Sequence, residues 1–336
     1  MTVDIAAAAR PLFTLGLPDE GWDERQKARS AHFLQGFAWA RFQSALGRRA
    51  AHSESDAWSW AGYLTLSRGI RHLYLPYGPT LAERSALPFA LESADAAARA
   101  LRADFLRCEP IGATEAALEG LGLRRVADVQ PEATSIVDLS LSVEELRRRV
   151  SSGHRNAINR AGSRGIKIAL TSDPSSLDSF LHLMSATTRM RDFRTHPRSY
   201  FETLLRSSGQ NVVLGLAGVE DRPIAGTLCF DGGDTRAYLF AASDPVARKI
   251  QAAVPLVWET MMDARRQGRT RYDLWGVAPR STGPDHPWSG FSQFKRSFGG
   301  IEVEYGGTWE LPVRPIRYAL YTGAKRMARS LRLGIS

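Results

Sequence analysis

The sequence has few of the residues that build disulfide frameworks, metal sites or nucleophilic triads. Its 336 residues include two cysteines, Cys108 and Cys229, which lie far apart and without the spacing of metal ligands. The seven histidines show neither metal spacing nor the arrangement of a catalytic triad, and no nucleophile-elbow sequence is present. We therefore expect no disulfide framework, no metal and no other cofactor.

Long hydrophobic runs are also missing. No stretch approaches the ~20 apolar residues of a transmembrane helix. The first residues, MTVDIAAAARPLF, have an early aspartate and only a short alanine-rich run, unlike a secretory signal. With 43% hydrophobic and 24% charged residues, the composition is that of a globular protein. We expect a cytoplasmic protein whose length corresponds to two domains.

Acidic residues are scarce in the second half of the chain. Residues 1–145 contain 15 Lys/Arg against 19 Asp/Glu, a net charge of −4, whereas residues 146–336 contain 29 against 16, a net charge of +13. Two stretches, 146–172 and 311–336, contain no acid at all. This asymmetry indicates a polyanion partner, such as RNA, a nucleotide-linked substrate or an anionic membrane surface. Solvated helix faces of an arginine-rich proteome are the alternative.

Helix and strand patterns alternate along both halves, which predicts an α/β protein. The expected helices cover residues 31–46, 86–102, 115–121, 175–189, 197–206 and 246–267. The expected strands cover residues 58–66, 72–75, 104–108, 130–141, 211–217, 223–230, 235–241 and the segment around Tyr272. Ser142 and Glu145 form a capping box that opens a further helix. We place the domain seam near residue 145, where the charge balance also changes.

The order of elements in the second half is that of the acetyltransferase-type α/β fold. In this fold, a loop at a helix N-terminus holds the pyrophosphate of acetyl-coenzyme A through backbone amides, with the sequence Gln/Arg-x-x-Gly-x-Gly/Ala. The corresponding stretch is 248–253, and Gln251 stands at its first glycine position. Because a side chain there obstructs the close approach that glycine permits, we expect a different acyl donor.

One lysine of the second half has an unusual setting. The strand that ends at Gly276 is followed by a Pro/Gly/Ser loop and then by Lys295, which Phe291, Phe294 and Phe298 frame. In a desolvated site a cation acts more strongly than in water, so this lysine is placed to stabilise a developing oxyanion. The alternative is an ordinary amphipathic helix start whose lysine extends along an aromatic face into solvent.

Short motifs, each weak alone, occur in an order and spacing that together are specific. They are His32-Phe33-Leu34-Gln35 with Trp39, Tyr77-Gly78-Pro79, Glu109-Pro110, residues 134–139, Arg155-Asn156, residues 164–168, residues 188–193, Trp258-Glu259, residues 272–276 and Phe294-Lys295. Through them nearly the whole chain resembles the FemABX family of peptidyltransferases. These enzymes use aminoacyl-tRNA to add amino acids to the peptide stem of peptidoglycan precursors.

The resemblance implies two tandem acetyltransferase-like domains with mixed, mostly antiparallel sheets flanked by helices. Residues 1–145 would form the acceptor side and residues 146–336 the aminoacyl-tRNA side. Members with a coiled-coil arm carry it between the strands that here join through the short turn at 219–224, so we expect no arm. The protein would be a monomer that contacts the inner face of the membrane peripherally.

The expected reaction is transfer of an amino acid from aminoacyl-tRNA to an amine of a peptidoglycan precursor, either lipid-linked or UDP-linked. An aminoacyl ester is already activated, so the reaction needs placement and oxyanion stabilisation rather than ATP or a metal. Many members have a lysine at the position of Gln43 that helps bind the acceptor's phosphates. The alternatives are a tailoring transferase for a peptide natural product, an acyl-coenzyme A-dependent N-acyltransferase and a non-catalytic RNA-binding module.

The resemblance also implies roles for single residues. Lys295 would stabilise the oxyanion, and Glu109 would bind the incoming amine or accept its proton. The implied substrate-binding residues are Arg191, Phe294, Tyr238, Trp39 and Tyr77, and the implied tRNA-binding residues are Arg147, Arg148, Arg149, Arg155 and Arg160. Structural alternatives remain: an N-cap or ion pair for Glu109, a helix-end salt bridge for Arg191 and a core aromatic for Tyr238.

Overall fold

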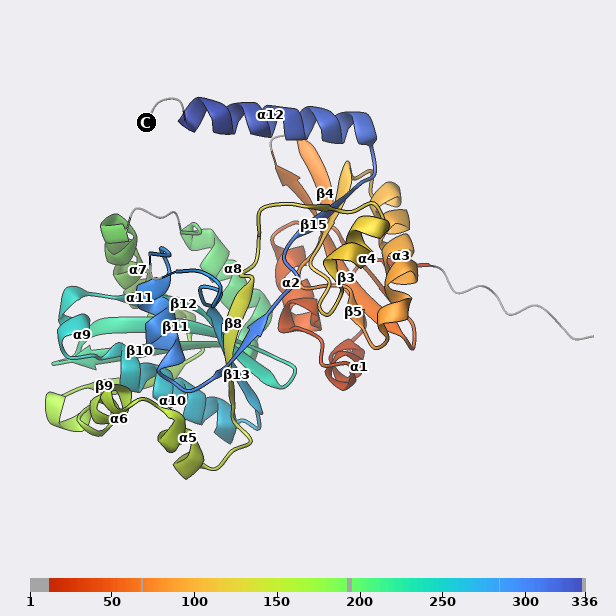
Figure 1. Cartoon of the computed structure of the whole chain (residues 1–336). Helices are drawn as coiled ribbons and strands as arrows, with labels where there is room; N and C mark the ends of the chain where they lie inside the picture. The colour runs from red at the N-terminus through yellow and green to blue at the C-terminus, as the bar shows by residue number, and fades with distance from the viewer. Residues whose placement is uncertain (1–11, 68, 192–194, 284, 334–336) are drawn as a thin grey trace, which may run out of the picture. The chain divides into compact units, whose positions relative to one another are not determined.

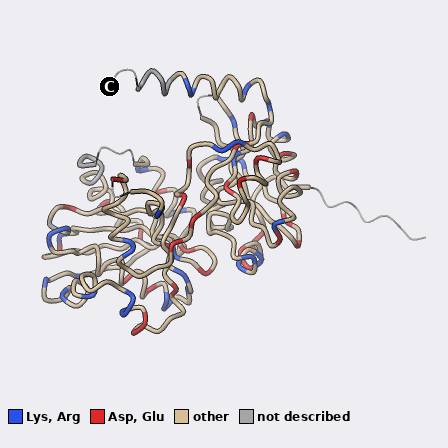
Figure 2. The backbone as a smooth tube through the Cα atoms, in the orientation of Figure 1, with Lys and Arg blue, Asp and Glu red and all other residues tan. Residues whose placement is uncertain are grey.

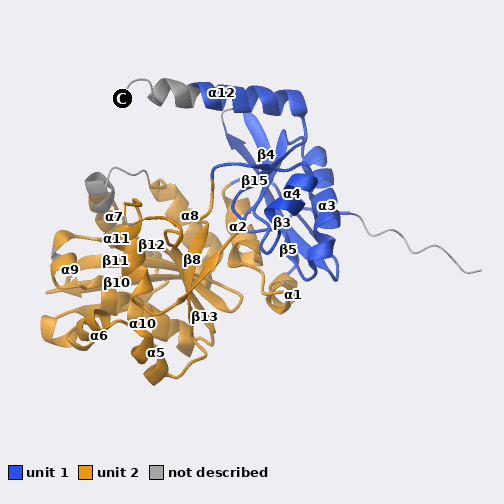
Figure 3. Cartoon of the chain, viewed as in Figure 1, with its two compact units in different colours: residues 1–20, 47–127, 306–336 blue, residues 21–46, 128–305 orange. Residues whose placement is uncertain are grey.

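The chain forms two compact units of mixed α/β structure. The computed structural model describes residues 12–67, 69–191, 195–283 and 285–333 (Figure 1). The first unit comprises Met1–Glu20, Gly47–Ala127 and Gly306–Ser336, and the second comprises Gly21–Leu46 and Asp128–Tyr305 (Figure 3). Each unit is built around one sheet. Neither unit is therefore a single continuous piece of the sequence.

The sheet of the first unit is mostly antiparallel. In spatial order its strands are β1 (Thr14–Leu15), β2 (Ala50–Glu54), β3 (Trp58–Ser67), β4 (Ile70–Leu75), β6 (Phe105–Cys108), β15 (Trp309–Pro312) and β7 (Arg124–Arg125), and β5 (Thr80–Leu81) pairs with β3. The β4–β6 pair is parallel, from His72 opposite Phe105 to Leu75 opposite Cys108. A parallel pair needs a crossover, which here contains a helix, α3 (Leu87–Ala100).

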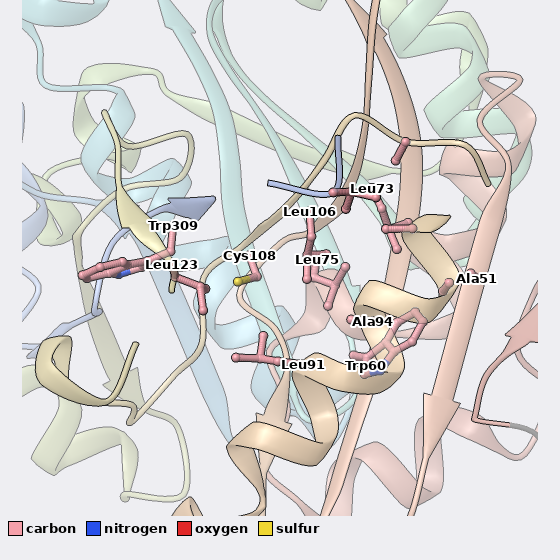
Figure 4. Packing of buried hydrophobic residues seen from close by; sticks show 14 of the residues in the cluster. Ala51, Trp60, Leu73, Leu75, Leu91, Ala94, Leu106, Cys108, Leu123 and Trp309 are labelled. Carbon is pink, nitrogen blue, oxygen red and sulfur yellow. The ribbon is translucent and has the colours of Figure 1, made fainter. Parts of the chain in front are cut away.

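Helix α3 supplies the apolar face that covers this sheet. Its Leu91 and Ala94 are buried against Trp60, Leu106 and other side chains of β3, β4, β6 and β15 (Figure 4). The remaining helical segments of the unit are η2 (Arg84–Ala86), α4 (Glu115–Gly120) and α12 (Pro315–Leu333). The first unit thus has its own hydrophobic core, in which two buried residues, Trp309 and Val313, come from the C-terminal part of the chain.

The sheet of the second unit repeats this plan. In spatial order its strands are β14 (Ile301–Glu304), β8 (Ala133–Asp138), β13 (Arg271–Gly276), β12 (Thr235–Ser243), β11 (Arg222–Gly232), β10 (Val212–Val219) and β9 (Lys167–Thr171). Again one pair, β12–β13, is parallel, and the connection between its strands contains a helix, α10 (Ala253–Arg266). The β–α–β crossover of the first unit therefore has a counterpart in the second.

The remaining helices of the second unit surround this sheet. They are α1 (Trp22–Ala28), η1 (Phe33–Gln35), α2 (Phe37–Ala45), α5 (Val143–Arg149), α6 (Ser152–Asn159), η3 (Gly162–Arg164), η4 (Pro174–Ser176), α7 (Leu177–Arg191), α8 (Arg198–Ser208), η5 (Gly209–Asn211), α9 (Pro245–Lys249) and α11 (Ser289–Arg296). Side chains of α10, such as Val257 and Met261, are buried with Tyr272 and Leu274 of β13 in a hydrophobic cluster of this unit.

The two sheets exchange strands. In the first unit, β15 from near the C-terminus lies between β6 and β7 and pairs antiparallel with both. In the second unit, β8 from the first half of the sequence lies between β13 and β14 and pairs antiparallel with both. Each sheet therefore contains one strand from the half of the sequence that supplies most of the other sheet.

The compact units therefore have other bounds than the expected halves 1–145 and 146–336. Residues 21–46 and the strand β8 belong to the second unit, and β15 with α12 belongs to the first. Local hydrophobic periodicity predicts that a strand is buried but does not tell which sheet it joins. The expected fold class, two tandem acetyltransferase-like units, is confirmed.

Two predicted helices are interrupted. The helix expected over residues 31–46 is split at Gly36 into η1 and α2, and the N–H of Phe37 donates to Asp23 Oδ1 at 2.6 Å. The helix expected over residues 246–267 is split into α9 and α10 around Gln251, whose φ is +56°.

The connection between β10 and β11 is a tight hairpin. Val219 pairs with Arg222, and the two residues between them, Glu220 and Asp221, have φ values of +51° and +60°. These values are typical of the two-residue turns that match the twist of antiparallel strands. Over the described part of the chain this hairpin stands where a coiled-coil arm would begin, and the expectation of an arm-less protein is confirmed.

Candidate active site

The strand β13 departs from regular strand pairing within the motif at residues 272–276. Arg271 to Asp273 pair with β12, but the pairing with β8 is shifted between Asp273 and Gly276. Trp275, inside this irregularity, has φ of +62°, a value that side chains other than glycine rarely adopt. The bulge turns the backbone, and the carbonyl of Gly276 faces a side chain of α11.

That side chain is Lys295. It lies in the last turn of α11 and is 8% exposed, and its Nζ donates a hydrogen bond of 2.7 Å to Gly276 O. The ammonium lies 5.1 Å from the ring centroid of Phe291, within range of a cation–π interaction. Burial lowers the pKa of Lys295 to about 8, while the charge of Asp273 acts in the opposite direction. The lysine is therefore a buried cation, not a side chain extending into solvent.

Asp273 organises the bulge beside this lysine. Its Oδ1 accepts a hydrogen bond of 2.7 Å from the backbone N–H of Trp275 and another from the hydroxyl of Thr134 on β8. Its Oδ2 lies 3.9 Å from Nε2 of His32. Since Asp273 is 2% exposed, its charge is buried with that of Lys295. A buried carboxylate keeps its charge at acceptable free energy only among such donors and cations.

His32 reaches Asp273 from the segment that precedes α2. Its Nδ1 accepts the N–H of Leu34 and so caps η1. Its ring lies 5.8 Å from that of Trp275 and 6.2 Å from that of Tyr305, by ring centroids. Burial lowers the pKa of His32, opposed by the neighbouring Asp273. His32 and Asp273 thus tie the N-terminal segment of the second unit to the end of β13.

Neither His32 nor Asp273 was identified from the sequence as a functional residue. A signal for Asp273 was present, because an acidic residue inside the buried strand Tyr272-Asp273-Leu274 needs a polar partner. His32 carried no comparable signal, since its partner comes from a distant part of the chain. Only the fold brings these residues together.

Phe294 and Tyr238 have different surroundings from Lys295. The ring of Phe294 lies 5.3 Å from that of His154 and 5.4 Å from that of Phe298, by centroids, and it packs against the core. Tyr238 is 8% exposed and belongs to the same core cluster, and burial raises the pKa of its hydroxyl. Their expected substrate-binding roles remain predictions, for side chains that here pack as core aromatics.

Trp39 belongs to an aromatic cluster of the second unit. Its ring centroid lies 5.1 Å from that of Phe42 and 5.4 Å from that of Phe230 on β11. Phe33 joins the cluster and also contacts Trp275, with a centroid distance of 5.5 Å. Trp39 is half-buried and therefore keeps part of its ring accessible. Gln43 lies one turn further along α2 and is buried.

Glu109 and Tyr77 lie together in the first unit. The Glu109 carboxylate follows β6 and accepts hydrogen bonds from the hydroxyl of Tyr74 (2.8 Å), the N–H of Tyr77 (3.1 Å) and the hydroxyl of Thr308 (2.6 Å). It is 3% exposed, and Tyr77, also buried, has φ of +48°. The carboxylate thereby joins the turn after β4 and the start of β15 to the end of β6. The end of β6 in the first unit is equivalent to the end of β13 in the second unit.

The arginines predicted to bind tRNA divide into two groups. Arg148, Arg149 and Arg160 are exposed on α5 and just after α6. Arg155 instead donates to the carbonyls of Arg148 (3.2 Å) and Val150 and so caps the C-terminal end of α5. Arg147 is half-buried, with its guanidinium 5.8 Å from the ring centroid of Trp258. Figure 2 shows how Lys and Arg are distributed along the chain.

Two further positions of the sequence prediction can be located. Arg191 ends α7, and its side chain lies outside the residues that the structure describes. Gln251, at the glycine position of the coenzyme-binding loop, is exposed and adopts the left-handed conformation that glycine normally supplies. The turn before α10 therefore has a left-handed residue at this position, although a side chain occupies it.

The fold and the site define a class of protein. The chain contains two acetyltransferase-like units in tandem. In the second unit, a buried lysine lies beside the end of β13, one strand of the parallel pair. This is the architecture of an acyltransferase. The model of the FemAB family matches residues 112–222 and again residues 217–326. The chain belongs to the FemAB family and is an aminoacyltransferase that acts in peptidoglycan bridge formation.

Several solved structures have a similar fold. The crystal structure of FemX is similar with a TM-score of 0.76 and 18% identity, covering 91% of this chain and 99% of that chain. L-PGS from Bacillus licheniformis is similar with a TM-score of 0.57 and 14% identity, covering 94% and 98%. A tandem GNAT protein from the clavulanic acid biosynthesis pathway is similar with a TM-score of 0.50 and 11% identity, covering 90% and 98%. At these identities the similarity shows the fold alone. A comparison with curated protein sequences gave no match.

Proposed function

We propose that the protein transfers an amino acid from aminoacyl-tRNA to an amine of the stem peptide of a peptidoglycan precursor, lipid-linked or UDP-linked. The observation that carries the proposal is the buried Lys295 ammonium beside the bulge of β13, in a chain of the FemAB family. No ATP, metal or covalent enzyme intermediate is required, because the ester of the aminoacyl-tRNA is already activated.

The reaction forms one C–N bond and breaks one C–O bond. The neutral amine attacks the carbonyl carbon of the aminoacyl ester, and the carbonyl oxygen becomes an oxyanion in the tetrahedral intermediate. The C–O bond to the terminal ribose then breaks, and the ribose hydroxyl leaves with a proton while the attacking nitrogen loses one. A donor that is already in place for the oxyanion lowers the barrier to both steps.

Lys295 is suited to supply that donor. An ammonium has three N–H donors, and among the described residues the hydrogen-bond acceptor that Nζ contacts is Gly276 O. The remaining donors can reach a substrate oxygen. With its pKa near 8, the side chain is mostly a cation at neutral pH. Phe291 and the surrounding burial keep the local dielectric low, which strengthens the interaction with an oxyanion.

Glu109 is the second residue to which we assign a role, in binding the incoming amine or accepting its proton. The three donors that hold its carboxylate support a fixed orientation of this group. Arg191, Phe294, Tyr238, Trp39 and Tyr77 complete the proposed substrate-binding set. Residues 1–145 are proposed to serve the acceptor and residues 146–336 the aminoacyl-tRNA.

The proposed location is the cytoplasm, with the protein acting as a monomer at the inner face of the membrane, where a lipid-linked precursor would lie. Among the described helices, none combines the length and the apolar character that crossing a bilayer requires. A UDP-linked precursor would be reached without membrane contact. The position of Gln43, where many family members have a lysine, makes the choice between these acceptors a matter for experiment.

The test is an incubation of the protein with a pool of charged tRNAs and with lipid-linked and UDP-linked precursors, read out by mass spectrometry. The expected product is a precursor whose mass is increased by one or more amino acid residues and which requires intact aminoacyl-tRNA. Lys295→Met should abolish most of the product, and Lys249→Met, at an exposed lysine of α9, should not. Modification of a peptide natural product alone would favour the tailoring transferase, and transfer from acyl-coenzyme A would overturn the proposed donor.

A further inference from the structure

The C-terminal helix α12 is fastened to the first unit by one of its faces. Arg317 Nε donates to Oδ1 of the buried Asp104 at 2.7 Å, and the hydroxyl of Tyr318 donates to Glu310 Oε2 at 2.9 Å. The rings of Tyr318 and Tyr321 lie 5.5 and 5.4 Å from that of Phe105, by centroids. These contacts fix the rotation of the helix about its axis, and thereby which side chains point away from the unit.

A stripe of large apolar side chains lies on the outer side of α12. Ile316, Leu320 and Met327 are 79%, 70% and 68% exposed, respectively. Their spacing of four and seven residues places them on one face of a helix. Gly323 lies between them on the same face, which keeps the stripe continuous and narrow. Single exposed apolar residues are ordinary, but three aligned on one helix form a surface that water solvates poorly.

The charge of the helix has one sign. Residues 311–336 contain Arg314, Arg317, Lys325, Arg326, Arg329 and Arg332 and no Asp or Glu. Of these, Lys325 and Arg326 are exposed. Lys325 lies on the side of the helix opposite to Ile316, with its Nζ 5.9 Å from the ring centroid of Tyr321, whereas Arg326 lies at the flank of the stripe. Figure 2 shows α12 with Lys and Arg but no acidic residue along its described length. An apolar stripe accompanied by basic residues is complementary to a surface with an apolar interior and anionic headgroups.

We propose that the outer face of α12 binds the surface of an anionic lipid bilayer, with Ile316, Leu320 and Met327 inserted among the lipids and Arg326, at the flank of this face, at the headgroups. A nucleic acid would use the basic residues but leaves the apolar stripe in water, so the lipid surface accounts for more of the observed face. The inference extends the membrane contact of the proposed function and does not depend on the transfer reaction.

Vesicle co-sedimentation of the full chain tests the proposal. Vesicles with 30% phosphatidylglycerol in phosphatidylcholine should bind the protein, vesicles of phosphatidylcholine alone should bind it roughly tenfold more weakly, and added salt should weaken the former. The triple variant Ile316→Gln, Leu320→Gln and Met327→Gln should lower the partition coefficient by at least about tenfold, because it removes the inserted apolar area. Arg326→Gln should weaken binding to the anionic vesicles only.

Two controls separate the outcomes. Leu66→Gln with Phe89→Gln removes apolar side chains that are similarly exposed elsewhere in the first unit and should leave vesicle binding unchanged. Thermal unfolding of each variant should match that of the parent protein, since every substituted side chain is exposed. The proposal is overturned if the parent protein does not bind anionic vesicles, or if the apolar triple variant binds them as well as the parent. A loss of tRNA affinity in Arg326→Gln, with unchanged vesicle binding, would assign this side of the helix to RNA instead. Transfer to a UDP-linked precursor should persist in every variant, so a failure of the membrane proposal leaves the transfer reaction standing.

Discussion

At the scale of single residues, the buried Lys295 ammonium lowers the stability of the fold and serves the proposed reaction. Its pKa is lowered from 10.5 to about 8, which means that burial of the charged form has a free-energy cost at neutral pH. The fold tolerates this cost at a position where one carbonyl and one aromatic ring face the charge. A cation kept in such surroundings is available for a developing negative charge.

Lys295→Met should lower kcat by roughly 100-fold or more, because the oxyanion loses a charged donor that acts mainly in the transition state. Affinity for charged tRNA and acceptor should change much less. Lys295→Arg should not restore the full rate, since a planar guanidinium cannot take the place of an ammonium. Single-turnover kinetics with separate binding measurements check this, and near-normal turnover in the methionine variant would end the oxyanion role.

The same Lys295→Met variant should be as stable as the parent protein or up to about 3 kcal/mol more stable at pH 7, because it removes a buried charge. The folded-state pKa lies below the unfolded value, so the unfolded chain binds more protons between about pH 8 and 10.5. The lysine's unfavourable contribution is therefore complete below pH 8 and disappears as the pH rises through this window. Urea unfolding at pH 7 and pH 10 measures both effects, with Lys249→Met as the exposed control.

Asp273→Asn should shift the pH dependence of turnover. If the cationic form of Lys295 is the active one, kcat falls as the pH rises above about 8. The charge of Asp273 raises the lysine pKa, so its removal should move this alkaline limb to lower pH. His32 and Tyr305 also lie near Asp273, but they add no charge, because burial lowers the pKa of His32 and raises that of Tyr305.

A purely structural role of Asp273 would give another result. Asparagine keeps an acceptor for the N–H of Trp275, so the bulge should persist and KM should change little. A uniform loss of kcat at every pH, without a shift of the alkaline limb of the pH profile, would contradict the electrostatic role. Asp273→Ala, which also removes the acceptor, should in addition lower stability.

Glu109→Gln should lower the free energy of unfolding by about 1–3 kcal/mol, because an amide group replaces an acceptor that three donors contact. Chemical denaturation measures this loss. If turnover also falls by roughly 100-fold or more at a temperature where the variant is fully folded, Glu109 has in addition the role of base. A variant as stable and as active as the parent would contradict both roles.

At the scale of elements, the pair α5 and α6 separates arginines that can meet a partner from those that hold the fold. Arg148→Gln, Arg149→Gln and Arg160→Gln together should weaken tRNA binding. The slope of log K against the logarithm of the salt concentration should become shallower by up to about 0.7–0.9 for each phosphate that is no longer neutralised. Filter binding at several salt concentrations measures the slope.

Arg155 supplies the matched comparison, because its guanidinium caps the end of α5. Arg155→Gln should lower the melting temperature, and it should change tRNA affinity little. Arg99→Gln, on α3 of the first unit, should change neither the slope nor the affinity. Equal tRNA binding by the triple variant and the parent at low salt would remove α5 and α6 from the RNA-binding surface.

The elements that local chemistry determines were predictable. The capping box of Ser142 and Glu145 is present at the start of α5, and the strands β10, β11 and β12 overlap the ranges expected at 211–217, 223–230 and 235–241. The short strand β2 was missed because its sequence, AAHSE, contains only small and polar residues. The break at Gln251 was missed because the apolar pattern gives no sign of the left-handed residue.

The site was predictable only in part, for a related reason. Lys295 could be singled out because its aromatic neighbours are close in sequence. Asp273 and His32 meet through the fold, across most of the chain. Tyr238 shows the reverse case, since a tyrosine in a strand carries no local sign that distinguishes a core position from a substrate contact.

At the scale of the whole molecule, the exchanged strands make each unit depend on both ends of the sequence. A chain that ends at Tyr305 lacks β15, which lies between β6 and β7 and carries the buried Trp309. We expect its first unit to be unfolded and its second unit to remain folded. Hydrogen exchange read out by mass spectrometry should show protection restricted to residues 21–46 and 128–305.

The complementary fragment is informative too. Residues 1–145 alone lack β15 and carry β8 without its partners β13 and β14, so we expect this fragment to stay unfolded. A fragment 1–145 with cooperative thermal unfolding would show instead that the first half of the sequence folds by itself.

The position of β15 in the first sheet also sets an order of events during synthesis. The strands β2 to β7 leave the ribosome early, yet the strand that joins β6 to β7 is made almost last. At about 5–20 residues per second, the growing chain waits roughly 10 to 40 s with the edge of β6 open. The unit whose synthesis begins first is thus the last to close, and a nascent chain that stalls before residue 309 presents an unpaired strand edge to its surroundings.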